Sequence, residues 1–336
     1  MMKRIWTIIS AVSFVWILAF NAQAVTIDLV PVGNPGNAND NTGYGCVDYT
    51  YSIGKFEITT GQYCEFLNAV ADTDTYGLYA PGMWDYTYSC KIERSGSPGS
   101  YIYSVAADRA NRPVNWVSWG SVARFCNWLS NGQPSGAQGL ATTEDGSYFL
   151  NGATTQSALM AVTRKPNATW VIPSENEWYK AAYHKNDGVT GNYWVYPTGT
   201  NSLPSNDLIN PDPGNNANFV QNGYTIDSPY FTTEVGEFEN SESPYGTFDQ
   251  GGNALEWNES VGTPGSYRVT RGGSWIDDSS HLLSSFRNAV GGNPAAGNSY
   301  IGFRVAYVPE PSSMMSLLGL SVIGLVAHCW RRNKTV

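Results

Sequence analysis

Two acidic side chains flank a pair of glycines in the stretch FDQGGNALEW, and this arrangement could bind a metal ion. Asp249 and Glu256 lie on either side of Gly251 and Gly252. Glycine lets the chain bend, so that backbone carbonyl oxygens can point inward together with the carboxylates. Hard oxygen ligands of mixed side-chain and carbonyl origin suit calcium. Two acids around a Gly-Gly pair are also typical of a solvated turn, and the spacing alone leaves both interpretations open.

A second group of reactive side chain types follows the stretch RGGSW. Ser274 comes directly after two glycines, and Asp277, Asp278 and His281 follow it. One histidine and two carboxylates are an incomplete version of the two-histidine, one-carboxylate site that binds iron. We favour the alternative of an exposed acidic loop, because the only other histidine of the body, His184, lies far along the chain. No G-x-S-x-G motif indicates a serine hydrolase.

The body of the chain has four cysteines, Cys46, Cys64, Cys90 and Cys126. In an exported chain they could form disulfides in any of three pairings. Cys126 falls on the apolar stripe of a predicted helix, so a buried free thiol is the alternative there. No cysteine occurs between Cys126 and Cys329. The segment after RGGSW therefore offers no thiolate for a soft metal such as copper(I).

Three segments carry apolar residues at helical spacing, and each begins with a side chain that can cap a helix. They are 59–71, 117–130 and 173–184, with the candidate caps Thr59 or Thr60, Ser118 and Ser174. In the last of them, Glu177 can complete a capping box with Ser174. Short strands are expected at 146–153 and 300–308. Helices and antiparallel strands in separate blocks indicate an α+β domain.

The composition indicates one domain with much irregular backbone. Glycine (35), tyrosine (21) and tryptophan (12) are numerous among the 336 residues, and runs of apolar periodicity are short. Residues 25–308 are enough for a single large domain with a substantial core. The formal net charge of −9 repels phosphate backbones, so we expect no nucleic-acid partner.

Both ends of the chain look like targeting segments. Residues 1–24 combine a basic start, an apolar run and a small-x-small cleavage site, which is typical of a signal peptide. A retained membrane anchor is the alternative. At the other end, the apolar run from Met314 to Trp330 is just long enough for a short transmembrane helix, and basic residues follow it at the end of the chain.

The tail 309–336 begins with a Pro-Glu-Pro triplet directly before this run and resembles the PEP-CTERM sorting tail of Gram-negative bacteria. The resemblance implies export through the inner membrane to the periplasm or cell surface. It also implies at least transient anchoring in the membrane through the C-terminal helix, and recognition and cleavage by a dedicated sorting protease. An ordinary tail anchor is the alternative.

The body resembles the formylglycine-generating enzyme (sulfatase-modifying factor) family. Six motifs in order carry the resemblance: YSIGKFEITTGQYCEFLNAVA, RPVNWVSWGSVARFCNWL, VIPSENEWYKAAY, YGTFDQGGNALEWNE, RGGSW and IGFRVA. They span residues 51–306. The resemblance implies a single compact α+β domain related to the C-type lectin fold, with low regular secondary structure, a surface cleft and two bound calcium ions.

The resemblance also implies which residues would bind calcium. The first site would use the side chains of Asp249 and Glu256 and the carbonyls of Gly252 and Ala254. The second site would use Asn218, the carbonyl of Phe219, Asp227 and a carbonyl near Pro229 or Tyr230. A polar loop without metal is the alternative for the second site.

The chemistry of the family is not matched. The resemblance implies oxidation of a substrate cysteine to an aldehyde with copper(I) as the cofactor. Two cysteines after RGGS would bind the copper, and this chain lacks both. We therefore do not expect copper. One hypothesis is a calcium-stabilised module at the cell surface that binds a peptide or a polysaccharide. The other is an oxidoreductase or protein-modifying enzyme with an altered active centre, which copper loading with oxygen consumption would favour.

The residues expected in the ligand cleft come from the segment after the RGGSW glycines. They are Ser274, Trp275, Asp277, His281 and Arg287. Tryptophan side chains could add stacking faces for a ligand, although most are expected in the core. The candidates are Trp84, Trp116, Trp119, Trp194, Trp257 and Trp275.

Overall fold

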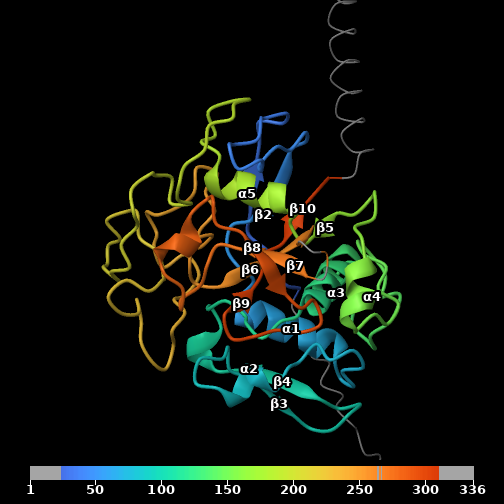
Figure 1. Cartoon of the computed structure of the whole chain (residues 1–336). Coiled ribbons are helices and arrows are strands. Elements are labelled where there is room, and N and C mark those ends of the chain that lie inside the picture. The colour runs from blue at the N-terminus through green and yellow to red at the C-terminus, as the bar shows by residue number, and fades with distance from the viewer. Residues whose placement is uncertain (1–23, 263–264, 266, 310–336) are drawn as a thin grey trace, which may run out of the picture.

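Three short β-sheets and five α-helices are joined by long irregular segments in the computed structural model, which describes residues 24–262, 265 and 267–309 (Figure 1). Helices and sheets form one body, and the largest irregular stretch lies between α5 and β6 on one side of it. The predicted single α+β domain with low regular secondary structure is confirmed.

The three predicted helices form, and each begins at a predicted cap. They are α1 (Thr60–Val70), α3 (Trp119–Ser130) and α5 (Glu175–Tyr183), with the N-caps Thr59, Ser118 and Ser174. The capping box of α5 is present, because the side chain of Glu177 also accepts from the N–H of Ser174 at 2.6 Å. Two shorter helices are α2 (Gly82–Asp85) and α4 (Gln156–Ala161).

The first sheet brings the two ends of the domain together in the order β1-β2-β10-β5. Its strands are β1 (Leu29–Val32), β2 (Tyr51–Gly54), β10 (Ala306–Tyr307) and β5 (Trp170–Val171). All neighbouring strands are antiparallel, and Ala306 of β10 lies opposite both Ile53 and Val171. The second sheet is a hairpin of β3 (Ile92–Ser95) and β4 (Ile102–Val105).

The third sheet, in the order β8-β7-β6-β9, supports the segments singled out in the sequence. Its strands are β8 (Asn288–Gly292), β7 (Arg268–Arg271), β6 (Leu255–Val261) and β9 (Ile301–Gly302). FDQGGNALEW leads into β6, and RGGSW begins where β7 ends. Two 3-10 helices, η1 (Ala107–Arg109) and η2 (Ser279–Leu282), complete the described elements.

The strand predicted at 146–153 is wrong. Only an isolated bridge between Tyr148 and Arg164 is present there. The reason is Asn127 of α3, whose amide donates to the carbonyls of Thr143 and Tyr148 and whose oxygen accepts from the N–H of Tyr148. A buried side chain thus satisfies backbone groups that a strand partner would otherwise satisfy. The segment 300–308 is a strand only in part, because β9 and β10 lie in different sheets.

The core is built from aromatic rings of α1, α3 and the segment between β9 and β10. Phe125 contacts Phe66 at 5.2 Å and Phe303 at 5.4 Å between ring centroids, and Tyr63 packs against the same group. These rings are fully buried. The apolar stripes predicted for both helices therefore face each other in the core.

All four cysteines of the body are free thiols in the structure. Three of them are buried, namely Cys64, Cys90 and Cys126, whereas Cys46 is partly exposed. For Cys126, burial agrees with its place on the predicted apolar stripe. Burial raises the pKa of the Cys64 thiol to about 12 and that of Cys90 to about 11, and it raises the pKa of Cys126 further. The buried thiols are thus held in their protonated form.

One ion pair joins both larger sheets and α5. Arg304 contacts Glu256 at 2.6 Å, and neither side chain is exposed to solvent. The guanidinium also donates to the carbonyls of Gly54 and Phe248, and Trp178 donates to the same carboxylate at 2.7 Å. This set of contacts, the central ion pair, replaces the water that both charges would need.

We expect Arg304→Ala to lower the free energy of unfolding by about 3–5 kcal/mol, because it leaves the Glu256 carboxylate buried without a partner. Urea unfolding of residues 25–308 measures the change. Lys165→Ala is the control, since the ion pair of Lys165 with Asp145 is partly exposed to solvent and should contribute about 0–1 kcal/mol. A loss below about 1 kcal/mol for Arg304→Ala would contradict the central role of the pair.

Candidate functional site

The first predicted calcium loop leads to the central ion pair. Both oxygens of Glu256 accept hydrogen bonds from Arg304, and one also accepts from Trp178. A carboxylate that an arginine already neutralises is a poor calcium ligand. Asp249 accepts from the N–H of Gly236 at 2.7 Å, and burial raises the pKa of Asp249 to about 6. In this arrangement the loop does not fit a calcium ion through Glu256.

The carbonyl positions of this loop have a structural role. Gly252 lies in the left-handed region at φ 86°, and its backbone runs beside Asn218 in an isolated parallel bridge. A Cβ atom at Gly252 would overlap the carbonyl of Asn218. The N–H of Ala254 donates to Glu57 at 3.0 Å. Glycine is therefore required at Gly252 by the close approach of two chain segments.

The second predicted calcium site contains an unpartnered oxygen. Asn218 is buried, and its amide nitrogen donates to the carbonyl of Phe231 at 2.9 Å and to Asn253 at 3.1 Å. Its Oδ1 atom is buried and accepts no hydrogen bond from the described residues. A buried acceptor without a donor is unfavourable, and a cation would satisfy it. Asn218 therefore fits a calcium ligand.

The other residues expected at this site lie nearby in the chain but differ in their surroundings. The carbonyl of Phe219 accepts from Asn206 at 3.1 Å and from Thr225 at 3.2 Å. Asp227 is exposed, and its backbone carbonyl accepts from the N–H of Tyr230. Among the residues that the structure describes, no group of three or more His, Cys, Asp or Glu side chains is arranged to hold a metal. Any cation here would depend mainly on neutral oxygens.

The RGGSW segment brings three of the predicted cleft residues together. Ser274 is buried and donates to Asp277 at 2.6 Å. The Nε2 atom of His281 lies 3.9 Å from the same carboxylate, and its Nδ1 atom lies 3.2 Å from Asp278. Hydrogen bonds, chiefly from Ser280, lower the pKa of Asp278. The hydroxyl of Ser274 therefore donates to a carboxylate, which differs from the serine–histidine hydrogen bond of a serine hydrolase triad.

The two arginines of this region have structural partners. Arg271 contacts Glu175 at 2.7 Å, and Arg287 contacts the same carboxylate at 2.7 Å. Both guanidinium groups also lie over the ring of Tyr44. Arg287 therefore helps to fix the start of α5 and is not a free cation of the cleft.

Beside this segment lies a group of six aromatic rings, which we call the aromatic platform. It consists of Tyr86, Tyr88, Trp116, Tyr224, Phe231 and Trp275. Tyr86 stacks on Trp116 at 5.1 Å and on Tyr88 at 5.5 Å, and the interplanar angles are 12° and 7°. Trp275 contacts Phe231 at 4.8 Å and Tyr224 at 5.8 Å. The rings form one continuous surface.

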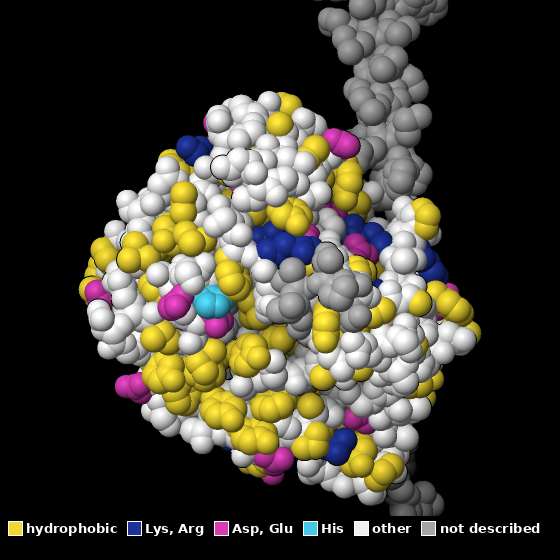
Figure 2. Space-filling view, viewed as in Figure 1, with side chains coloured by type: hydrophobic (Ala, Val, Ile, Leu, Met, Phe, Trp, Pro, Cys, Tyr) yellow, Lys and Arg dark blue, Asp and Glu magenta, His cyan; other side chains and the backbone are white. Residues whose placement is uncertain are grey.

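The platform faces solvent, although its members differ in exposure. Tyr86 is 46% exposed and Tyr224 is 43% exposed, whereas Trp275 is buried at the base of the group. Figure 2 shows hydrophobic side chains gathered on this face, below the histidine and over the region of α2. Exposed apolar surface of this continuity is typical of an interaction site.

The backbone under two of the rings is strained. Trp116 and Phe231 both adopt φ 61°, a conformation that is rare for bulky residues. The ring of Trp116 lies so close to Gly82 that a Cβ atom there would be 2.5 Å away. The carbonyl of Phe231 accepts from Asn218. Residues held in such conformations cluster at functional sites.

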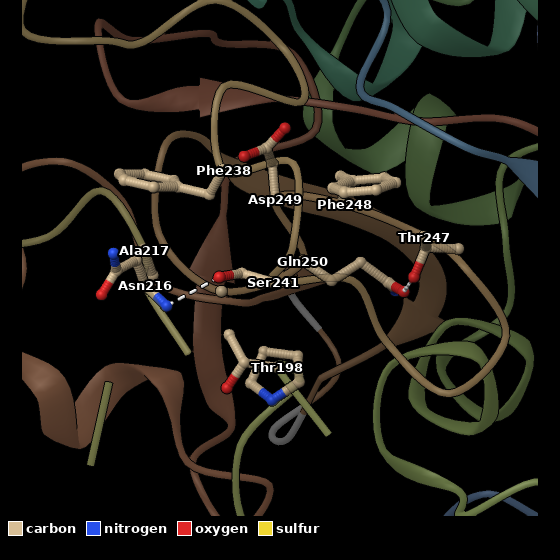
Figure 3. Close-up of a pocket in the computed structure, with 11 residues that line it drawn as sticks. Thr198, Asn216, Ala217, Phe238, Ser241, Thr247, Phe248, Asp249 and Gln250 are labelled. Atoms are coloured by element: carbon tan, nitrogen blue, oxygen red, sulfur yellow. Dashed lines mark hydrogen bonds between the residues drawn. The ribbon is translucent and has the colours of Figure 1, made fainter. Parts of the chain in front are cut away.

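A small cavity beside Asp249 and Gln250 is lined largely by polar side chains (Figure 3). Its volume is about 10 Å³, which is room for about one water molecule. Thr247 donates to Gln250, and Ser241 accepts from the N–H of Asn216 at 2.8 Å. The Asp249 carboxylate points away from Thr198 and Gln250 in Figure 3. The hydrogen bonds around the cavity stabilise the loop, and the cavity offers no space for a larger ligand.

The sequence identified only part of the platform. Trp116 and Trp275 were among the candidate stacking residues, while Trp119 and Trp257 are fully buried in the core. Tyr86, Tyr88, Tyr224 and Phe231 were not predicted. The dense aromatic run MWDYTY around Tyr86 was the one local signal for them.

The expected targeting segments lie almost entirely outside the described residues. This holds for the signal peptide at 1–24, of which only the last residue is described, and for the sorting tail at 309–336, of which only the first is. Within the described part of the chain, no helix has the length and apolar character needed to cross a membrane.

Comparisons with known proteins agree with the motif order. Residues 44–308 match the family described as sulfatase-modifying factor enzyme 1-like domain, and residues 308–332 match the PEP-CTERM protein-sorting motif. The second match indicates export and sorting in a Gram-negative bacterium by a system that recognises the tail. A search of curated proteins finds no match.

The chain is similar to a number of solved structures, three of which follow. The crystal structure of CarF is 21% identical, covers 84% of this chain and 98% of its own, and has a TM-score of 0.50. Treponema denticola variable protein 1 is 18% identical, with coverage of 86% and 98% and a TM-score of 0.47. PvdO from Pseudomonas aeruginosa is 17% identical, with coverage of 84% and 91% and a TM-score of 0.43.

The likeness to CarF concerns the fold alone. The family match covers most of the chain and includes the FDQGGNALEW, RGGSW and IGFRVA segments whose geometry is described above. The chain belongs to the sulfatase-modifying factor family.

Proposed function

We propose that this protein is an exported binding module that holds an extended ligand on its aromatic platform, on a scaffold that does not carry out the oxidation known for the family. The observation that carries the proposal is the continuous, partly exposed surface of six rings. Aromatic faces bind peptide side chains or sugar rings through apolar contact, and their rigidity keeps the entropic cost of binding low.

The platform is prepared for binding before a ligand arrives. Trp116 is held between Tyr86 and Gly82, and its indole N–H has no acceptor among the described residues. Stacking, not hydrogen bonding, therefore sets the position of this ring. A preformed apolar surface avoids the ordering cost that a flexible surface would have to meet on binding.

The charges beside the platform limit the class of ligand. Asp277 and Asp278 lie in the segment that follows Trp275, and His281 is within reach of both carboxylates. Like charges across an interface oppose binding. A neutral or positively charged ligand suits this border better than an acidic one.

Calcium enters the proposal as a structural ion at Asn218. The unpartnered Oδ1 of Asn218 and the carbonyl of Phe219 would supply neutral oxygens, and Asp227 could supply a carboxylate. A bound ion would fix the backbone that positions Phe231, since the amide of Asn218 donates to its carbonyl. The loop from Asp249 to Glu256 is stabilised by the central ion pair instead.

The alternative function, an oxidoreductase or protein-modifying enzyme with an altered centre, is favoured by family membership. The three buried thiols do not support the oxidation known for the family. Cys64, Cys90 and Cys126 are buried with raised pKa values, and copper(I) requires thiolates. Asp277 and Asp278 are hard ligands that do not replace them.

The platform is tested with Tyr86→Ala and Tyr224→Ala on arrays of peptides and oligosaccharides. We expect each change to weaken binding of the recognised ligand about tenfold, or about 1.4 kcal/mol, because each removes a partly exposed ring of the platform. Phe149→Ala is the control, since Phe149 is 53% exposed and lies outside the platform. Equal loss in all three variants, or no loss in any, would exclude the platform as the binding surface.

The formylglycine reaction is not expected. The protein, supplied with copper(I), oxygen and a cysteine-containing sulfatase peptide, should produce no aldehyde, because no thiolate pair follows RGGSW. Hydrazide labelling and mass spectrometry of the peptide measure the product. Aldehyde above a copper-only control that is lost in Ser274→Ala would establish the alternative function.

The calcium proposal predicts a difference in melting temperature between calcium and chelator. At a hundredfold excess over the dissociation constant, one ion stabilises the native state by about 2.7 kcal/mol. Asn218→Ala should abolish this difference, and Asn218→Asp, which keeps an oxygen, should preserve it. Glu256→Gln should lower the melting temperature equally in both conditions. If chelation leaves the wild-type melting temperature unchanged, calcium has no structural role.

A further inference from the structure

An open polar groove adjoins the aromatic platform and shares Tyr224 with it. The groove has a volume of about 600 Å³ and is lined by residues 203–208 and 221–225. This volume lies within the range of about 300–1,000 Å³ that is typical of small-molecule sites. Tyr224 contacts Phe231 at 5.4 Å on the platform side, so that the two surfaces are continuous.

The lining of the groove consists mainly of amide and hydroxyl side chains. Gln221 and Asn222 line one wall, and neither side chain forms a hydrogen bond with another described residue. Amides supply both donors and acceptors, which is what a ligand rich in hydroxyl groups requires. No lysine or arginine lines the groove, and its charged side chain, Asp207, accepts from Ser205 at 2.8 Å.

The walls of the groove are fixed to the rest of the site. Asn206 donates to the carbonyls of Phe219 and Gly223 at 3.1 and 3.0 Å, which joins the two walls. The N–H of Val220 donates to the carbonyl of Asp277 at 2.8 Å, so that one wall is attached to the segment after RGGSW. The groove and the platform are therefore connected through these hydrogen bonds.

We propose that the groove and the platform together bind a neutral polysaccharide, with sugar rings stacked on the platform and further sugar hydroxyls bonded in the groove. This rests on the proposed function of the platform and names its ligand class. The flat C–H face of a pyranose ring suits an aromatic face, and amides suit its hydroxyls.

Two other ligand classes fit this surface less well. An extended peptide gains affinity from a free strand edge, and the groove walls consist of turns and loops without a strand. An acidic polysaccharide would meet the carboxylates of Asp207, Asp277 and Asp278 without a lining cation.

The experiment measures binding of the full chain to cellohexaose and chitohexaose, with polygalacturonate and a neutral tyrosine-containing peptide as competitors of other classes. We expect a neutral hexasaccharide to bind, and Gln221→Ala and Asn222→Gly each to weaken binding at least about fivefold. Glycine at position 222 tolerates the φ of 61° found there, so this change removes the amide without straining the backbone. Asn151→Gly is the matched control, because Asn151 is exposed, has φ 45° and lies outside both surfaces.

The outcomes separate this inference from the function on which it rests. If Tyr86→Ala and Tyr224→Ala weaken binding but the two groove variants behave like Asn151→Gly, the platform is the binding surface and the groove inference is wrong. If polygalacturonate or the peptide binds in preference to both hexasaccharides, the ligand class is wrong. If no platform variant affects any ligand, both the inference and the proposed function fail.

Discussion

The central ion pair of Arg304 and Glu256 is the constraint on which the rest of this fold depends. It lies where two sheets, α5 and the loop after Phe248 meet, and both charges are removed from water. Such a pair adds little stability over apolar packing, but leaving either charge alone would be severely destabilising. The segments around it are therefore held together, and this explains how so much irregular backbone keeps a defined shape.

The ion pair also decides where a cation could act. Because Arg304 neutralises Glu256, the loop that most resembles a calcium site has its carboxylate already engaged. The unpartnered oxygen lies across the Gly252 contact, on Asn218. The amide of that same side chain supports Phe231, one of the strained residues of the platform. The contact between Gly252 and Asn218 and the hydrogen bond from Asn218 to Phe231 thus connect the loop of the ion pair to the rings of the platform.

The sequence predicted what depends on local chemistry. Caps and apolar stripes placed α1, α3 and α5, and motif order indicated the family. It failed where distant side chains intervene, as at 146–153, where Asn127 satisfies the backbone. The sequence also did not predict that Arg304 pairs with Glu256, because the two residues lie apart in the chain. It did not predict the platform, because the six rings come from separate segments.

The carboxylates of Asp277 and Asp278 in the segment after RGGSW bear on both possible functions. Ser274 donates to the carboxylate of Asp277, and this hydrogen bond fixes the segment after RGGSW. The same carboxylates border the platform and disfavour acidic ligands. Trp116 and Phe231 hold their rings in the platform through a backbone conformation that is unfavourable for bulky residues, and such residues cluster at functional sites. The segment after RGGSW therefore offers hard carboxylate ligands and no thiolate, while Trp116 and Phe231 fix the rings of the platform beside it.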